Sequence, residues 1–88
     1  MDLASFANDH SESRIVIKAG GAWHSIEIDS HNALTVENGS SLSEIGLHIE
    51  DLNELEVEER ADLREALGGQ FDRAYKMPLE TEDDGSDQ

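Results

Sequence analysis

The sequence predicts an α+β fold, in which a small antiparallel sheet of three or four strands packs against one main helix at about residues 53–67. Two segments rich in β-branched residues around Gly20-Gly21 predict a hairpin, and a later run of apolar residues with helical spacing predicts the helix. With 88 residues, the chain suits one domain with one modest core. We therefore expect a single domain over residues 1–78.

Both ends of the chain are expected to contribute little to the core. Residues 1–12 include Leu3 and Phe6, which can dock on a core, but they show no clear period, and we expect them to be loosely ordered. Residues 79–88 follow the only proline, Pro78, and are acidic with a single apolar residue. We expect them to form a disordered acidic tail.

The hairpin is the clearest element. Residues 14–19 and 22–28 flank Gly20-Gly21, a two-residue loop that can adopt positive φ angles. Closing this loop predicts the opposite pairs Ala19 and Ala22, Ile17 and His24, Ile15 and Ile26, and Arg14 and Glu27. This register gathers the isoleucines on one face and places Lys18 opposite Trp23 on the other. Because it sorts apolar from charged residues and matches opposite charges, we take it as the native register.

The segment between the hairpin and the helix gives a less decisive pattern. Residues 33–37 predict a third strand that ends at Asn38-Gly39. Residues 41–52 show two patterns that predict different elements. Ser41 and Glu44 form a capping box, which is typical of a helix. Ile45, Leu47 and Ile49 alternate with polar residues or glycine, which is typical of a strand. We favour a fourth strand here, because the intervening Gly46 weakens a helix.

The main helix is predicted from its two ends. Asn53 and Glu56 form a capping box, and Gly68-Gly69 stops the helix. The apolar residues that would face the sheet are Leu55, Leu63, Ala66 and Leu67. A further helical turn before Pro78 is suggested by Phe71, Ala74 and Tyr75.

The composition is strongly acidic, with 21 Asp and Glu against 6 Lys and Arg and a formal net charge of -15. Such a field repels DNA, RNA and anionic membranes, so we expect no direct binding to nucleic acid or to a membrane. The expected partner is a basic, Lys- and Arg-rich protein surface. Because no apolar run approaches the roughly 18 residues that cross a bilayer and no signal peptide is visible, we expect a cytoplasmic protein.

Catalytic and metal-binding motifs are missing from the sequence. The chain has no cysteine, which excludes disulfides, zinc fingers and thiol catalysis. It also has no P-loop, no dinucleotide-binding glycine motif and no nucleophile elbow. The histidines are scattered without the spacing of metal ligands, at His10, His24, His31 and His48. We therefore expect a non-enzymatic protein without a cofactor or a metal.

Two features are candidate partner-binding sites. On a helical wheel of residues 53–67, four acids lie within about 80° of each other, namely Glu54, Glu58, Asp62 and Glu65. Glu50 and Asp51 join this stripe if the helix begins earlier. The stripe is either a docking surface for Lys and Arg or an ordinary solvated face. Trp23 is either an exposed anchor for a partner or a cover for the second sheet face, packed with Phe71 or Tyr75.

These features predict an acidic interaction protein that binds a basic protein surface, acting as a nucleic-acid mimic or as an inhibitor of a nucleic-acid-binding complex. In size and charge alone, without any shared motif, the chain resembles the small acidic inhibitors that phages and mobile elements encode against restriction or CRISPR machinery, and such an inhibitor would act in the host cytoplasm. One alternative is an antitoxin or immunity partner of a single basic protein. Another is a salt-adapted domain whose charge reflects only solvation. Because burial in so small a domain is marginal, we also expect self-association to a homodimer through a sheet edge or the leucine-bearing helix.

Overall fold

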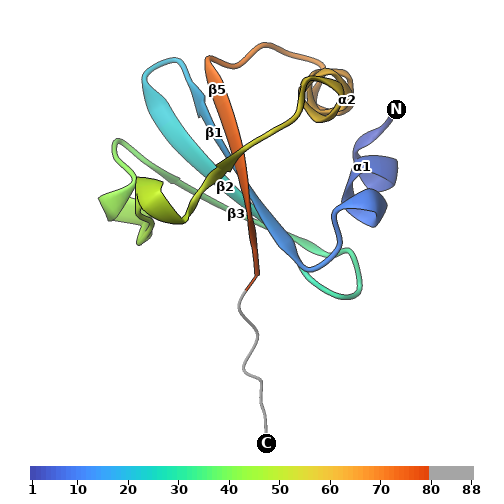
Figure 1. Cartoon of the computed structure of the whole chain (residues 1–88), viewed down its shortest axis with the longest axis horizontal. Helices are drawn as coiled ribbons and strands as arrows, with labels where there is room; N and C mark the ends of the chain where they lie inside the picture. Colours follow the sequence, from blue (N-terminus) through green and yellow to red (C-terminus); the bar gives the residue numbers. More distant parts are fainter. Residues whose placement is uncertain (80–88) are drawn as a thin grey trace, which may run out of the picture.

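The computed structural model describes residues 1–79 as a five-stranded antiparallel sheet with two helices on one of its faces (Figure 1). The elements are α1 (Leu3–Asp9), β1 (Ser13–Ala19), β2 (Ala22–Ile28), β3 (Leu34–Gly39), the 3-10 turns η1 (Ser43–Ile45) and η2 (Ile49–Asp51), β4 (Asn53–Glu54), α2 (Val57–Leu67) and β5 (Arg73–Pro78). The strand order is β3-β2-β1-β5-β4. The predicted α+β fold is confirmed, with five strands in place of three or four.

The central hairpin has the predicted register. Ile15 lies opposite Ile26, and Ile17 lies opposite His24. The turn uses Gly20 and Gly21 at φ angles of 61° and 81°, which glycine adopts without strain. On the other face, the Arg14 guanidinium forms the expected ion pair with the carboxylate opposite it.

The sheet has apolar side chains on both faces, and each face is covered by different elements. The helix-side cluster consists of Phe6, Ala7, Ile15, Ile17, Ile26, Ile28, Leu55, Leu63 and Ala74. The second cluster consists of Val16, Ile45, Leu47 and Tyr75, with Trp23, Leu42, Leu52 and Met77 packed against it. The two helices cover the first cluster, and the η1 and η2 segment covers the second (Figure 1).

Residues 41–52 form neither the strand that we favoured nor the alternative helix. The Glu44 amide donates to the Ser41 hydroxyl over 3.3 Å, so the predicted capping contact exists, but it serves a single 3-10 turn. Gly46 then reverses the chain at a φ angle of 74°. Ile45 and Leu47 are both buried. Their alternation reflects docking on the second sheet face and not pairing within the sheet.

The predicted helical turn at residues 71–75 is wrong, because residues 73–78 form β5 beside β1 in the sheet. Ala74 belongs to the helix-side cluster, whereas Tyr75 belongs to the second cluster. Since both faces of the sheet are covered, successive residues of this strand are buried, and the two-residue period disappears from the sequence.

The main helix begins at Val57 and not at Asn53. Residues 53 and 54 instead pair with β5 as β4, and Leu55 is buried between the strand and the helix. The helix ends where the sequence predicts, at Gly68 with a φ angle of 69°.

The two ends of the described chain lie against the sheet and its helices. Residues 1–12, which show no clear sequence period, contain α1, whose first turn is capped by Asp2 and which buries Phe6. At the other end, the Leu79 amide donates to the Glu12 carbonyl over 3.0 Å. The rest of the predicted acidic tail, residues 80–88, lies outside the described residues.

Candidate functional site

Most basic side chains of this protein are engaged in internal contacts. Arg14 pairs with Glu27, and Lys76 Nζ lies 2.7 Å from Glu59 Oε2. Two cations lie over aromatic rings: Lys18 Nζ is 5.6 Å from the centroid of the Trp23 ring, and Arg64 Cζ is 5.1 Å from that of the Phe71 ring. The Arg73 guanidinium donates a hydrogen bond to the Tyr75 hydroxyl over 3.4 Å. These contacts involve all the Lys and Arg residues except Arg60, but only Arg14 and Lys76 are paired with carboxylates. Arg60 and Arg73 line a small pocket with Glu54.

Exposed acids gather along the β4 edge of the sheet. We call this surface the acidic edge and define it as Glu50, Asp51, Glu54, Glu56 and Glu58, all of which are exposed. The segment that carries it runs from η2 past the edge strand β4 to the first turn of α2 (Figure 1). Among the described residues, the carboxylates in ion pairs are Glu27, Glu59 and Glu65, and none of them belongs to the acidic edge.

The structure divides the predicted acidic stripe into two parts. Because α2 begins at Val57, Glu54 lies on a strand, where it extends the acidic edge and not the helix surface. Asp62 is half-buried on α2. Glu65 forms an ion pair within the chain, because its Oε1 lies 2.7 Å from the amino group of Met1. The sequence-predicted residues that remain together are therefore those before and at the start of α2.

Trp23 lies away from the acidic edge, on β2. It is half-buried and packs against the second cluster, with its ring centroid 6.2 Å from that of Tyr75. Lys18, directly opposite on β1, covers part of the same ring. Of the two alternatives given for Trp23 in the sequence analysis, this position corresponds to a side chain that covers the second sheet face beside Tyr75.

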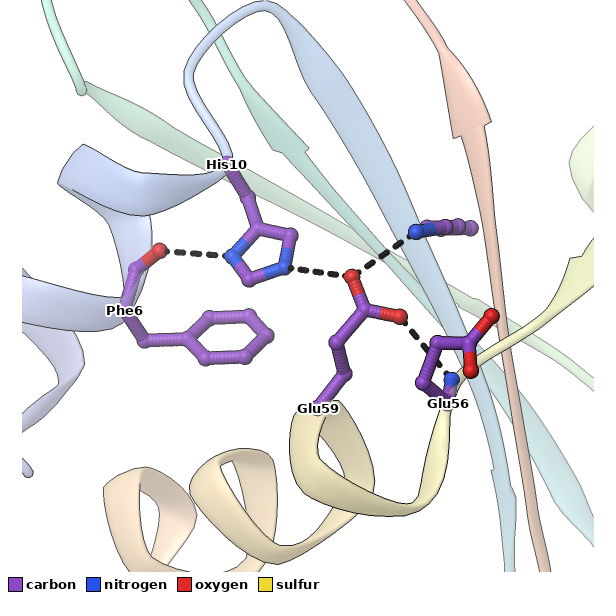
Figure 2. Close-up of polar contacts among 5 residues, drawn as sticks. Phe6, His10, Glu56 and Glu59 are labelled. Carbon is purple, nitrogen blue, oxygen red and sulfur yellow. Dashed lines mark hydrogen bonds and ion pairs between the residues drawn. The ribbon is translucent and has the colours of Figure 1, made fainter.

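A cluster that the sequence did not predict joins α1, α2 and β5 around Glu59. The Glu59 carboxylate accepts hydrogen bonds from Lys76 Nζ at 2.7 Å and from the Glu56 amide at 2.9 Å, and it lies 3.3 Å from His10 Nε2 (Figure 2). Burial raises the pKa of Glu59, but these hydrogen bonds lower it by more, so that the net pKa lies below its usual value. The cluster borders an open pocket of about 350 Å³ that Ser13 and Asn53 also line.

Each of the two ring nitrogens of His10 lies within hydrogen-bond distance of an oxygen atom. Its Nδ1 lies 3.0 Å from the Phe6 carbonyl oxygen, which can only accept, and its Nε2 faces the Glu59 carboxylate (Figure 2). The ring also stacks on Phe6, with centroids 4.2 Å apart. Because the Glu59 carboxylate accepts hydrogen bonds from Lys76 and from the Glu56 amide and also contacts His10, this cluster ties α1 to α2 and β5. Residues 10, 59 and 76 are so far apart in the chain that no spacing pattern could reveal them.

Comparison of the chain with protein-family models, with curated proteins and with solved structures finds no match. Within residues 1–79, no three His, Asp or Glu side chains are arranged to hold a metal ion. No helix in that part of the chain has the length and apolar character needed to span a membrane. The charge distribution of the described residues is therefore the feature on which a function can be argued.

Proposed function

We propose that this chain is a non-enzymatic interaction protein that binds a Lys- and Arg-rich protein surface in place of nucleic acid. The observation that supports this proposal is that the five carboxylates of the acidic edge are exposed and take part in none of the ion pairs of the described residues, although Arg60 and Arg73 line a small pocket beside Glu54. With a net charge of -15, such a surface attracts basic proteins from a distance and repels polyanions.

The spacing of the acidic edge also supports this proposal. Glu54 lies on β4, and Glu56 has extended backbone angles, with φ at -65° and ψ at 161°. Residues two apart on an extended chain are separated by about 6.6 Å, which is close to two axial phosphate steps of about 3.4 Å along one DNA strand. A basic groove that binds a phosphate backbone can therefore meet one carboxylate of this edge for about every second phosphate.

The class of target follows from this chemistry. A protein whose basic groove holds DNA or RNA is the natural competitor, as in restriction and CRISPR complexes, and the chain would then act as an anti-restriction or anti-CRISPR inhibitor in the cytoplasm of a phage host. An antitoxin or immunity protein for one basic partner would use the same surface. The two differ in whether nucleic acid displaces the chain from its target.

The test is affinity capture from the source cells, followed by binding measurements on the purified captured protein. The expected target binds nucleic acid and is released from the immobilised chain by double-stranded DNA. The variant that combines Glu50→Lys, Glu54→Lys and Glu58→Lys should lose binding. The matched control combines Asp9→Lys, Glu12→Lys and Glu37→Lys, which are exposed positions outside the acidic edge, and should retain most of it.

Two outcomes would contradict this proposal. If DNA fails to release the captured protein, the chain does not compete with nucleic acid, and the antitoxin alternative gains support. If the two triple variants weaken binding equally, the net charge acts diffusely and the acidic edge is not the binding site. Circular dichroism of both variants establishes that each is folded before binding is compared.

A further inference from the structure

Strand β3 forms the edge of the sheet opposite to the acidic edge. The strand order places β3 at one end and β4 at the other. Nearly all of β3 is exposed, and it includes two large apolar side chains in solvent, Leu34 at 38% and Val36 at 56%. Within the described chain no strand pairs with its outer side, so that side presents backbone donors and acceptors to solvent.

The surface around β3 is the part of the chain with the fewest charges. Residues 30–43 carry one charged residue, Glu37, in a protein with 21 Asp and Glu. Natural sheet edges are usually protected from pairing by lysines, by proline or by a bulge. β3 has no lysine and no proline, its one charged residue is Glu37, and its register with β2 runs without interruption from Gly39 to Leu34. This edge is therefore open to pairing with another strand.

The exposed apolar residues of β3 extend the core of the domain. Val36 lies opposite Ile26 and Leu34 lies opposite Ile28. Both isoleucines belong to the helix-side cluster, and directly opposite residues of an antiparallel pair share a face. The helix-side apolar face therefore continues beyond the helices to the β3 edge, where it has no cover within the described residues.

We propose that two copies of this chain pair antiparallel through β3 and form a symmetric dimer with one continuous sheet. A two-fold axis perpendicular to the sheet at this edge keeps Leu34 and Val36 of both copies on the same face. The two apolar side chains of one copy then lie beside the same two side chains of the other. The outer side of β3 also presents backbone N–H donors and C=O acceptors that match those of a second, antiparallel β3. The edge is thus complementary to a second copy without any further element.

Charge favours this contact over any other between two copies. Two chains with a net charge of -15 repel each other, and they can approach most closely where charge is sparse. With strands about 4.8 Å apart, the two acidic edges of the dimer would lie about 43 Å from each other, several times the Debye length of about 8 Å in physiological salt. The dimer would thus carry its acidic edges at its two ends, away from the contact.

The test is sedimentation velocity of the full chain from about 10 μM to about 1 mM, in about 0.15 M and about 1 M salt. Because six residues per strand make a small interface, we expect a weak dimer, with a mass that rises from 9.7 kDa to twice that value with concentration. Added salt should increase the dimer fraction, since it screens the repulsion between copies. A chain that stays monomeric throughout overturns the proposal and leaves β3 as an edge for an extended segment of another protein.

A matched pair of variants locates the contact. Val36→Lys places a charge on the edge and should give a monomer, whereas Val57→Lys makes the same change at another exposed valine, 73% exposed on α2, and should still dimerise. A Val36→Lys protein that dimerises like the parent chain overturns the proposal. Hydrogen exchange of the unaltered chain provides a second measurement, because backbone amides of β3 should exchange more slowly as concentration rises. Exchange from β3 that is independent of concentration would likewise overturn it.

Discussion

The Nε2 atom of His10 lies 3.3 Å from the Oε2 atom of Glu59, and this contact joins the end of α1 to the first turn of α2. The same carboxylate oxygen accepts a hydrogen bond from Lys76 on β5. Three elements that are distant in the chain therefore meet at one side chain. Because that carboxylate is only 22% exposed, its contacts should contribute measurably to the stability of the domain.

We expect Glu59→Gln to lower the free energy of unfolding by about 1 kcal/mol near neutral pH. The pKa of Glu59 lies below its usual value of 4.5 in the folded chain, so its contribution is present above that pH and is lost as pH falls through the lower, folded value. The difference in melting temperature between the parent chain and the variant should therefore shrink as the solution is acidified.

The control for this experiment is Glu58→Gln, which removes the same charge from an exposed neighbour on α2. Its effect on the melting temperature should be small and should not follow the Glu59→Gln profile. A Glu59→Gln difference that persists undiminished in acid would show that the charge of Glu59 is not what joins the three elements.

Gly39 should be sensitive to the smallest substitution. A Cβ atom at this position would lie 3.0 Å from the Glu44 Cβ atom and 3.1 Å from the Ile45 Cγ2 atom, at the contact between β3 and η1. We expect Gly39→Ala to cost about 1–3 kcal/mol of stability, because the buried Ile45 side chain has little room to shift. Chemical denaturation measures this difference.

Gly69→Ala is the matched control, since a Cβ atom there meets nothing within 4 Å. It should be neutral or slightly stabilising, because alanine restricts the unfolded chain more than glycine does. Equal losses at the two glycines would mean that η1 does not pack on β3 as described.

Trp23→Ala should destabilise the domain by about 2 kcal/mol, because the indole covers the second cluster beside Tyr75. Leu34→Ala serves as the comparison, since Leu34 is exposed on the edge strand and should cost much less. Thermal unfolding measures both. If Trp23→Ala leaves stability unchanged and abolishes binding of a captured partner, Trp23 is a binding anchor and its packing on the sheet contributes little.

The salt dependence of folding separates an interaction protein from a salt-adapted domain. We expect cooperative thermal unfolding by circular dichroism in about 20 mM salt, where repulsion between charges is poorly screened. The buried residues of both clusters and the internal contacts of the basic side chains support this expectation. A coil spectrum that becomes folded only in molar salt would show that the acidic composition serves solvation in concentrated salt.

Local chemistry allowed the hairpin and the end of α2 to be predicted from sequence. The Gly20-Gly21 turn and the alternation on both sides of it set the register of β1 and β2, since a shift by one residue would bury charges. Gly68 stops α2 because glycine adopts a positive φ angle without steric cost. The excess of acids likewise needs no structure to be recognised.

Tertiary contacts decided the elements that the sequence described wrongly. β5 is buried on both faces, which hides its period, and residues 41–52 dock by short turns on a face that the sequence does not show to be covered. Pairing with β5 also takes residues 53 and 54 out of the helix, which moves Glu54 to the acidic edge. The His10 and Glu59 contact likewise exists only because the sheet brings α1 beside α2. Sequence alone thus determined what nearest neighbours impose and how much charge the chain carries, whereas the folded structure decided where that charge lies, because the burial of a side chain depends on residues far away in the chain.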